Sequence, residues 1–284
     1  MKKVVSLCVF GKNEDYWKCS LQAIINNSIV YKDFIVRLYI SSFDYDHILV
    51  SVLEEMYKCF PFFELGIVDK KYVSLEATMW RMLPLWAADV DVFLCRDVDA
   101  FPVSMEVKST YYFLNHAEYD IHGIRSYISH GGLCLMAGLC GFKKERFKHL
   151  PGVPTYEDYE KYTYHISWGG DQEALKQYFY KFDETKHLVT LDTVLGNCST
   201  EIFNPSVFNP SRVSIEEYKK EDISFIQPTK ILEWGDDGRV EYAGQHQYFN
   251  IDIFKASLEL DCDVSRSMKK CIENNEKVKL YLGM

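Results

Sequence analysis

The sequence has 284 residues, of which 48% are hydrophobic, and a formal net charge of −9. This length suits one large domain or two small ones, and the hydrophobic fraction excludes a disordered chain. The acidic balance argues against a general nucleic-acid-binding protein, because such proteins carry a basic patch. No apolar stretch approaches the roughly 20 residues that a transmembrane helix needs.

The cysteine pattern distinguishes between classes of protein. The sequence holds nine cysteines, an odd number, and no C-x-x-C motif. Four of them lie inside apolar runs: Cys8, Cys95, Cys134 and Cys140. This pattern is typical of buried free thiols in a reducing compartment, and unlike a disulfide framework or a zinc site. The first apolar run is broken at Gly11, too early for a secretory signal peptide, so we expect a cytoplasmic protein.

The first hundred residues alternate between strand and helix patterns. Short apolar runs predict strands at Val4–Phe10, Phe34–Ser41, Phe62–Val68 and Asp91–Cys95. Helical spacing predicts helices at Asp15–Asn27, His47–Cys59 and Leu75–Ala87, the last kinked or ended by Pro84. Such alternation implies βαβ units in a parallel sheet.

The pattern changes after residue 100. We expect a helix at Ser109–His116, a strand at Tyr119–Ile124, a loop becoming a helix over 166–179, a loop over 204–212 and two helical pieces over 253–282. No repeat or linker-like stretch interrupts the chain. The sequence therefore predicts a single α/β domain, with a mostly parallel sheet flanked by helices and with further helices at its C-terminal end.

Two aspartates follow the fourth predicted strand. In parallel sheets ligands bind beyond the carboxyl ends of the strands, which places Gly11–Asn13 and Arg96–Asp99 on one rim. Asp97 and Asp99 are two residues apart and could converge on one cation, and carboxylates with phosphate oxygens suit Mg²⁺ or Mn²⁺. Without a cation, repulsion would raise the pKa of one carboxyl group.

Other interpretations of this pair remain. The two aspartates also fit ordinary turn or capping residues. An EF-hand loop is excluded, because Ala100, Phe101 and Pro102 follow where oxygen ligands and a glycine are needed. A haloacid-dehalogenase-like phosphatase is disfavoured, because Phe101 occupies the position of its Thr or Val and the pair follows the fourth strand, not the first.

Several stretches together resemble GT-A-fold glycosyltransferases. "MWRMLPLWAADVDVFLCRDVDAFP" resembles the R-D-x-D region that closes the nucleotide-binding half, and "VVSLCVFGKN" resembles the first strand and loop. "HGGLCLMAGLCGFKK", "WGGDQEAL" and "YAGQHQYFN" follow in the family's order, over roughly residues 4 to 250. The resemblance implies a GT-A-like (Rossmann-like) fold with a nucleotide-sugar-binding half at about 1–105, an acceptor-side half at about 106–250 and a helical tail at 251–284.

The resemblance implies roles on the donor side. Mn²⁺ or Mg²⁺ would be held by Asp97, Asp99 and His246, with Asp97 holding the ribose or sharing the metal. The donor would contact Gly11, Asn13, Arg81, Arg96 and Asp97. A neutral imidazole is a reasonable metal ligand, and a guanidinium can bind a diphosphate with two hydrogen bonds. The alternatives are a surface histidine between two glutamines and a solvated or packing arginine.

The resemblance also implies an acceptor side. Asp171 and Gln172 would be the catalytic residues, and His130, Gly131, Ala137, Gly138, Trp168 and Gly170 would line the acceptor and sugar. In an inverting enzyme Asp171 would be the general base, whereas in a retaining enzyme the departing phosphate takes the acceptor proton. The Asp-Gln pair and the late histidine favour the retaining outcome slightly. Asp171 also fits a plain helix N-cap.

The expected activity is transfer of a sugar from a UDP- or GDP-sugar to a hydroxyl acceptor. Glycans, proteins, lipids and modified DNA bases all stay open as acceptors, with DNA disfavoured by the charge, and the oligomeric state is open. Ala100 stands where many relatives have serine. The alternatives are a sugar-nucleotide pyrophosphorylase, whose Gly-rich basic loop is missing after the first strand, and a non-catalytic nucleotide- or carbohydrate-binding module of the same fold.

Overall fold

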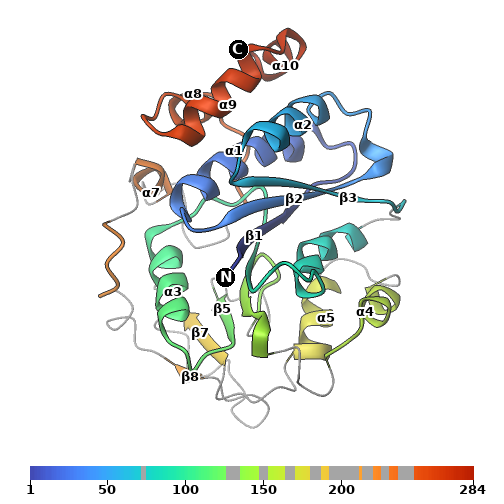
Figure 1. Ribbon diagram of the computed structural model, residues 1–284, viewed down its shortest axis with the longest axis vertical. Coiled ribbons are helices and arrows are strands. Elements are labelled where there is room, and N and C mark those ends of the chain that lie inside the picture. The colour runs from blue at the N-terminus through green and yellow to red at the C-terminus, as the bar shows by residue number, and fades with distance from the viewer. Residues whose placement is uncertain are drawn as a thin grey trace.

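A mixed β-sheet forms the centre of the molecule (Figure 1). The computed structural model describes residues 1–71, 75–125, 135–146, 153–163, 170–179, 187–191, 211–212, 220–224, 230–235 and 246–284. Within these ranges the strands are β1 (Lys3–Cys8), β2 (Ile35–Ser41), β3 (Phe63–Val68), β4 (Val92–Arg96), β5 (Ile121–Arg125), β6 (Leu139–Lys143), β7 (His187–Leu191) and β8 (Ser211–Arg212). Their order in the sheet is β3-β2-β1-β4-β6-β5-β7-β8.

The first four strands confirm the predicted parallel half. β1 pairs in parallel with β2 on one side and with β4 on the other, and β3 pairs in parallel with β2. The chain thus moves outward from β1 to β3 and then returns to the opposite side of β1. Where strand order reverses in this way, the crevice beyond the carboxyl ends of the two central strands is the usual ligand site. That point lies beyond the ends of β1 and β4.

The second half of the sheet contains two strands, β6 and β7, that the sequence did not predict in any form. β6 runs antiparallel to both β4 and β5, while β5, β7 and β8 pair in parallel. β5 confirms the strand expected at Tyr119–Ile124. The expected loop over 204–212 is wrong at its end, where Ser211–Arg212 form β8; its other residues lie outside the described ranges.

Helices cover the sheet on both faces. They are α1 (Glu14–Val30), α2 (Val50–Cys59), α3 (Ser104–Asn115), α4 (Tyr156–Thr163), α5 (Gly170–Phe179), α7 (Lys230–Gly235), α8 (Ile251–Leu258), α9 (Asp263–Glu273) and α10 (Glu276–Leu282), with the 3₁₀ helices η1 (Ser42–Asp44), η2 (Leu75–Leu85) and η4 (Lys144–Arg146). The helix expected at Leu75–Ala87 is present as 3₁₀ and ends one residue after Pro84. The tail forms three helices in place of the two expected.

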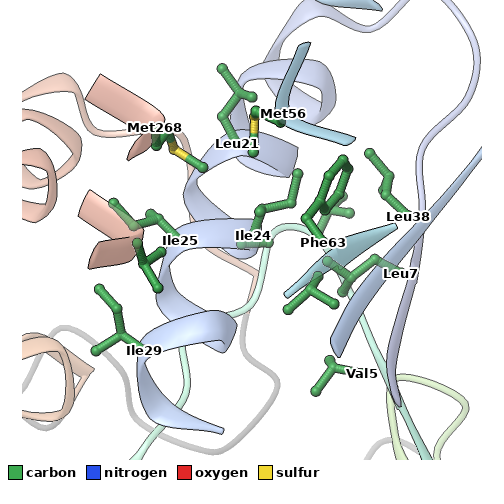
Figure 2. Close-up of a cluster of buried hydrophobic side chains, with 14 of the residues drawn as sticks. Val5, Leu7, Leu21, Ile24, Ile25, Ile29, Leu38, Met56, Phe63 and Met268 are labelled. Atoms are coloured by element: carbon green, nitrogen blue, oxygen red, sulfur yellow. The ribbon is translucent and has the colours of Figure 1, made fainter. Parts of the chain in front are cut away.

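The main hydrophobic core surrounds α1 (Figure 2). Ile24 points toward Phe63 of β3, while Ile25 lies on the other side of α1, toward Met268 of α9. This second contact surface explains why α1 is buried on almost every face over 17–30. In Figure 1 the C-terminal helices lie against α1 and α2, on the side of those helices away from the sheet. The core therefore depends on the C-terminal helices as well as on the sheet.

Three of the four cysteines expected to be structural are buried and free: Cys8, Cys95 and Cys140. Cys134 lies outside the described residues. Across the ranges that the structure describes, no helix has both the length and the apolar character to cross a membrane.

We predict that Met268→Ala lowers the free energy of unfolding by about 2–5 kcal/mol, because it removes a fully buried side chain between α9 and α1. Urea unfolding measures this. Leu280→Ala is the matched control: Leu280 is 83% exposed on α10, and its truncation should change stability by less than about 0.5 kcal/mol. Equal effects of the two substitutions would contradict the packing described for α9.

Charged residues form a network at the opposite rim, near the amino ends of the strands. Lys2 Nζ lies 2.6 Å from carboxylate oxygens of both Glu64 and Asp89, and Arg37 Nη2 lies 2.8 Å from Asp89 Oδ2. The hydrogen bond from Lys2, and next that from Arg37, lower the pKa of Asp89 from 3.8 to about 2. The network therefore favours the charged carboxylate in the folded state.

This shift gives a pH prediction with a definite sign. A folded-state pKa below the unfolded value stabilises the protein above about pH 4, and this stabilisation is lost as the pH falls toward 2. Because the Asp89 side chain is 51% exposed, Asp89→Asn should cost less than about 1 kcal/mol at pH 7. Unfolding of both proteins from pH 7 to pH 2 should show the difference shrinking, and a constant difference would contradict the assignment.

Candidate functional site

The loop after β1 begins the candidate site. Gly11 has φ 82°, a conformation that favours glycine. Its N–H donates to Asp44 Oδ2 at 3.4 Å, and its carbonyl accepts from Trp17 Nε1 at 2.8 Å. Asn13 is the N-cap of α1, and its side chain accepts from the Asp15 N–H at 3.0 Å. Gly11 and Asn13 therefore shape the rim beside the carboxyl end of β1, as the sequence placed them.

Arg81 connects two other expected site residues. It lies on η2, is 5% exposed, and its guanidinium is paired through Nη1 with Asp97 Oδ1, directly after β4. Its Nη2 lies 2.6 Å from Asp171 Oδ2, in the first turn of α5. One buried cation thus joins carboxylates that are far apart in the sequence.

Electrostatics favour the charged form of this arginine. Burial by itself would lower the pKa of Arg81, but the carboxylates of Asp97 and Asp171 outweigh it and hold the pKa well above its ordinary value. Asp171 is fixed further, since its Oδ1 accepts the backbone N–H of Gln172 at 2.9 Å. Gln172 itself is partly exposed beside the pair. The group is therefore a fixed cation with a carboxylate on each side.

Small residues make room for Asp97. Ala137 and Gly138 form the buried turn before β6, and a Cβ on Gly138 would overlap Asp97 Oδ2 and stand 2.5 Å from Asp97 Cγ. Gly170, also buried, begins α5 directly before Asp171. The structure thus places Gly138 against Asp97 and Gly170 directly before Asp171, while the acceptor-side role of Ala137, Gly138 and Gly170 stays a prediction.

Asp99 has a different partner from Asp97. Its Oδ2 lies 2.5 Å from His246 Nδ1, and its backbone carbonyl accepts the N–H of Gln247 at 2.6 Å. Ala100 and His246 form an antiparallel β-bridge. The hydrogen bond to Asp99 is the largest cause of a raised pKa for His246, with burial opposing it. A segment 147 residues further along the chain is thereby fastened to the aspartate loop.

The expected three-ligand metal site is assembled only in part. In the described part of the chain, no group of three or more His, Cys, Asp or Glu side chains is close enough to hold a metal ion. Asp97 is engaged with Arg81, whereas Asp99 and His246 are adjacent. A carboxylate oxygen beside an imidazole nitrogen is a donor set that fits Mn²⁺ or Mg²⁺ when water and phosphate oxygens fill the remaining positions.

Arg96 points away from the rim, contrary to the expectation that it binds the donor. Its Nε lies 2.5 Å from Glu106 Oε1. The two terminal nitrogens donate to the carbonyls of Cys95 and Cys140 and to the hydroxyls of Tyr31 and Thr110. These contacts use all five N–H groups of a guanidinium. Arg96 thus has no donor left for a ligand.

Some expected residues cannot be placed, and others were missed. His130, Gly131 and Trp168 lie outside the described residues. Sequence reasoning missed Glu106, which is 2% exposed and pairs with Arg96, and Asp44, which faces Gly11. A glutamate in the first turn of the helix after the aspartates was the available signal for Glu106, but spacing alone does not reveal burial.

Comparison with known proteins gives distant structural likenesses. No family model and no curated protein matches the sequence. Residues 1–349 of S. aureus TarS align with 63% of this chain at 13% identity and a TM-score of 0.43. The mannosyltransferase PcManGT from Pyrobaculum calidifontis, in complex with GDP-Man and Mn²⁺, aligns with 56% at 14% identity and a TM-score of 0.39. M. tuberculosis glucosyl-3-phosphoglycerate synthase aligns with 88% at 12% identity and a TM-score of 0.42.

The aligned regions differ in extent. They span 55% of the TarS chain and 50% of the mannosyltransferase chain, about half of each, and 89% of the synthase. At these TM-scores the likeness establishes neither a family nor an activity for this chain.

We predict that Gly138→Ala lowers the free energy of unfolding by about 1–3 kcal/mol, because its methyl group would displace Asp97 from Arg81. The same substitution in an Asp97→Ala background should cost much less, since the overlapping carboxylate is gone. Urea unfolding of the two single variants and the double variant measures the coupling. An equal cost in both backgrounds would show that Gly138 is not constrained by Asp97.

Proposed function

We propose that the chain is a metal-dependent glycosyltransferase that transfers a sugar from a UDP- or GDP-sugar to a hydroxyl acceptor. The observation that carries this proposal is the pairing of Arg81 with both Asp97 and Asp171. It brings the aspartate motif, the preceding helix and the Gly-Asp-Gln segment together where the strand order reverses. The order of these motifs resembles GT-A-fold glycosyltransferases, and their spatial convergence supports the same interpretation.

The metal would be held by Asp99 and His246, whose side chains lie in hydrogen-bond contact. Asp97 has the separate task of fixing Arg81, and Arg96 takes no part in donor binding because its N–H groups are engaged in the interior. A divalent ion bound there supplies positive charge that stabilises the departing nucleotide. Gly11 and Asn13 would contact the donor from the loop that follows β1.

Arg81 would bind the donor diphosphate or the sugar next to it. A buried guanidinium between two carboxylates is fixed in orientation before any ligand arrives, which reduces the entropy lost on binding. Ala137, Gly138 and Gly170 carry small or no side chains, so the sugar can approach this group closely. We assign residues 1–105 to the nucleotide-sugar half and 106–250 to the acceptor half on this basis.

The position of Asp171 favours a retaining outcome. Both of its carboxylate oxygens are already engaged, one by Arg81 and one by the backbone N–H of Gln172, so Asp171 is poorly placed to take a proton from the acceptor. Asp171 then stabilises positive charge that develops on the sugar, and Gln172 contacts the sugar or the acceptor. The proton of the acceptor hydroxyl passes to the departing phosphate. An inverting enzyme would need a less constrained base.

Two rival functions can be distinguished by what they release. A sugar-nucleotide pyrophosphorylase would consume pyrophosphate and release a nucleoside triphosphate, and the loop at Gly11 lacks the arginine and glycines that this reaction needs. A binding module of the same fold would bind a nucleotide sugar and release no free nucleotide.

The test is nucleotide release from a panel of UDP- and GDP-sugars with Mn²⁺ and with EDTA. We predict Mn²⁺-dependent release of nucleoside diphosphate with one of them, and a loss of at least about 100-fold in Asp99→Asn, because a metal ligand is removed. Binding of the same sugar, followed as a thermal shift, should weaken without Mn²⁺.

Asp261→Asn is the matched control, the same chemical change at a carboxylate that is 98% exposed in the connection between α8 and α9. It should retain full activity. Binding without release in the wild type would favour the binding module, and the absence of both would overturn the proposal. Full activity in Asp99→Asn at saturating Mn²⁺ would overturn the metal assignment alone.

A further inference from the structure

The segment that carries both aspartates is closed at its two ends by one ion pair. Arg96 is the last residue of β4, and Glu106 lies in the first turn of α3. Their side chains meet at 2.5 Å, with 4% and 2% of each exposed. Asp97 and Asp99 lie between them. The aspartate segment is therefore a short closed loop anchored in the interior.

The anchor reaches elements on several sides. Glu106 Oε1 also accepts from the Tyr31 hydroxyl at 2.9 Å, directly after α1. Arg96 donates to the Cys140 carbonyl of β6 at 3.4 Å and to the Thr110 hydroxyl of α3 at 3.3 Å. Its guanidinium carbon also lies 5.8 Å from the centroid of the Tyr31 ring. The pair thus fixes β4 relative to α1, α3 and β6.

We propose that Arg96 and Glu106 are positioning residues, which set the place of Asp97 and Asp99 and so the affinity of the aspartate segment for a divalent cation. This inference rests on the proposed function, since it assigns a purpose within that site. A salt bridge in the interior is weak evidence for stability, because desolvation offsets much of the attraction between the charges. The Arg96–Glu106 ion pair beneath this loop is better explained by the geometry that it imposes on the loop than by a gain in stability.

The side-chain directions support this assignment. Asp97 pairs with Arg81 from η2, while Arg96, its immediate neighbour, points to the opposite face and pairs with α3. Successive residues of an extended strand alternate in this way, so fixing Arg96 also fixes the rotation of the backbone at Asp97. Asp99 is fixed at the far side of the loop by His246 and Gln247.

The experiment replaces the pair by apolar residues of similar size, Arg96→Met with Glu106→Leu. Exchanging a buried ion pair for apolar side chains is often neutral for stability, so the fold should persist while the directional contacts are lost. We expect the Mn²⁺ concentration for half-maximal nucleotide release to rise by at least about tenfold, with little change in melting temperature.

Two further variants keep the test decisive if the double variant unfolds. Arg96→Lys keeps the charge but loses the forked contacts to Cys140 and Thr110, and should raise the Mn²⁺ requirement partially. Val107→Ala is the matched control: it destabilises the same helix at a fully buried apolar position whose side chain makes no hydrogen bond to the pair, and should leave the Mn²⁺ requirement unchanged.

The outcomes separate the two proposals. No Mn²⁺-dependent nucleotide release in the wild type would overturn the proposed function. Wild-type release with an unchanged Mn²⁺ requirement in the double variant and in Arg96→Lys would overturn the positioning role alone. The positioning role would also be overturned if Val107→Ala raised the Mn²⁺ requirement as much as the double variant and Arg96→Lys do, since the effect would then follow from general destabilisation.

Discussion

The arrangement of the site depends on the guanidinium of Arg81. Asp97 follows β4 and Asp171 lies in the first turn of α5. Their negative charges would repel each other if the two side chains met without a cation between them. Arg81 supplies that cation from η2, a 3₁₀ helix that Pro84 brings to an end. This contact ties α5 to η2, and the absence of a side chain at Gly138 leaves the space that Asp97 needs to reach Arg81.

Three neighbouring charged residues at the end of β4 make their contacts with separate parts of the molecule. Arg96 faces the interior and α3, Asp97 faces η2 and α5, and Asp99 meets the segment at His246. The spacing of two residues suggested that both aspartates share one cation. The structure gives each a separate partner, because the chain turns at Val98 and Asp99 and the alternation of side chains ends at that turn.

Local sequence patterns were sufficient to predict much of the fold. β1 to β4 and the helices between them are periodic in apolar residues, and so were predictable with small errors at their ends. β6 was not, because its sequence, LCGFK, follows a stretch rich in glycine and alanine that resembles a loop. For the site, Arg81 and Asp171 were named from the resemblance. The burial of Arg96 was unpredictable, because its partner Glu106 is defined only by how α3 packs on the sheet.

The β-bridge between Ala100 and His246 also bears on the order of events during synthesis. β1 to β4 are complete in the first third of the chain, and parallel units of this kind can begin to pack as soon as they emerge from the ribosome. The partner of Asp99 arrives 147 residues later. A nascent chain can thus hold a nearly finished parallel half of the sheet before the contact of Asp99 with His246 forms, and long-range closure of this kind is slow because the intervening chain must be ordered first.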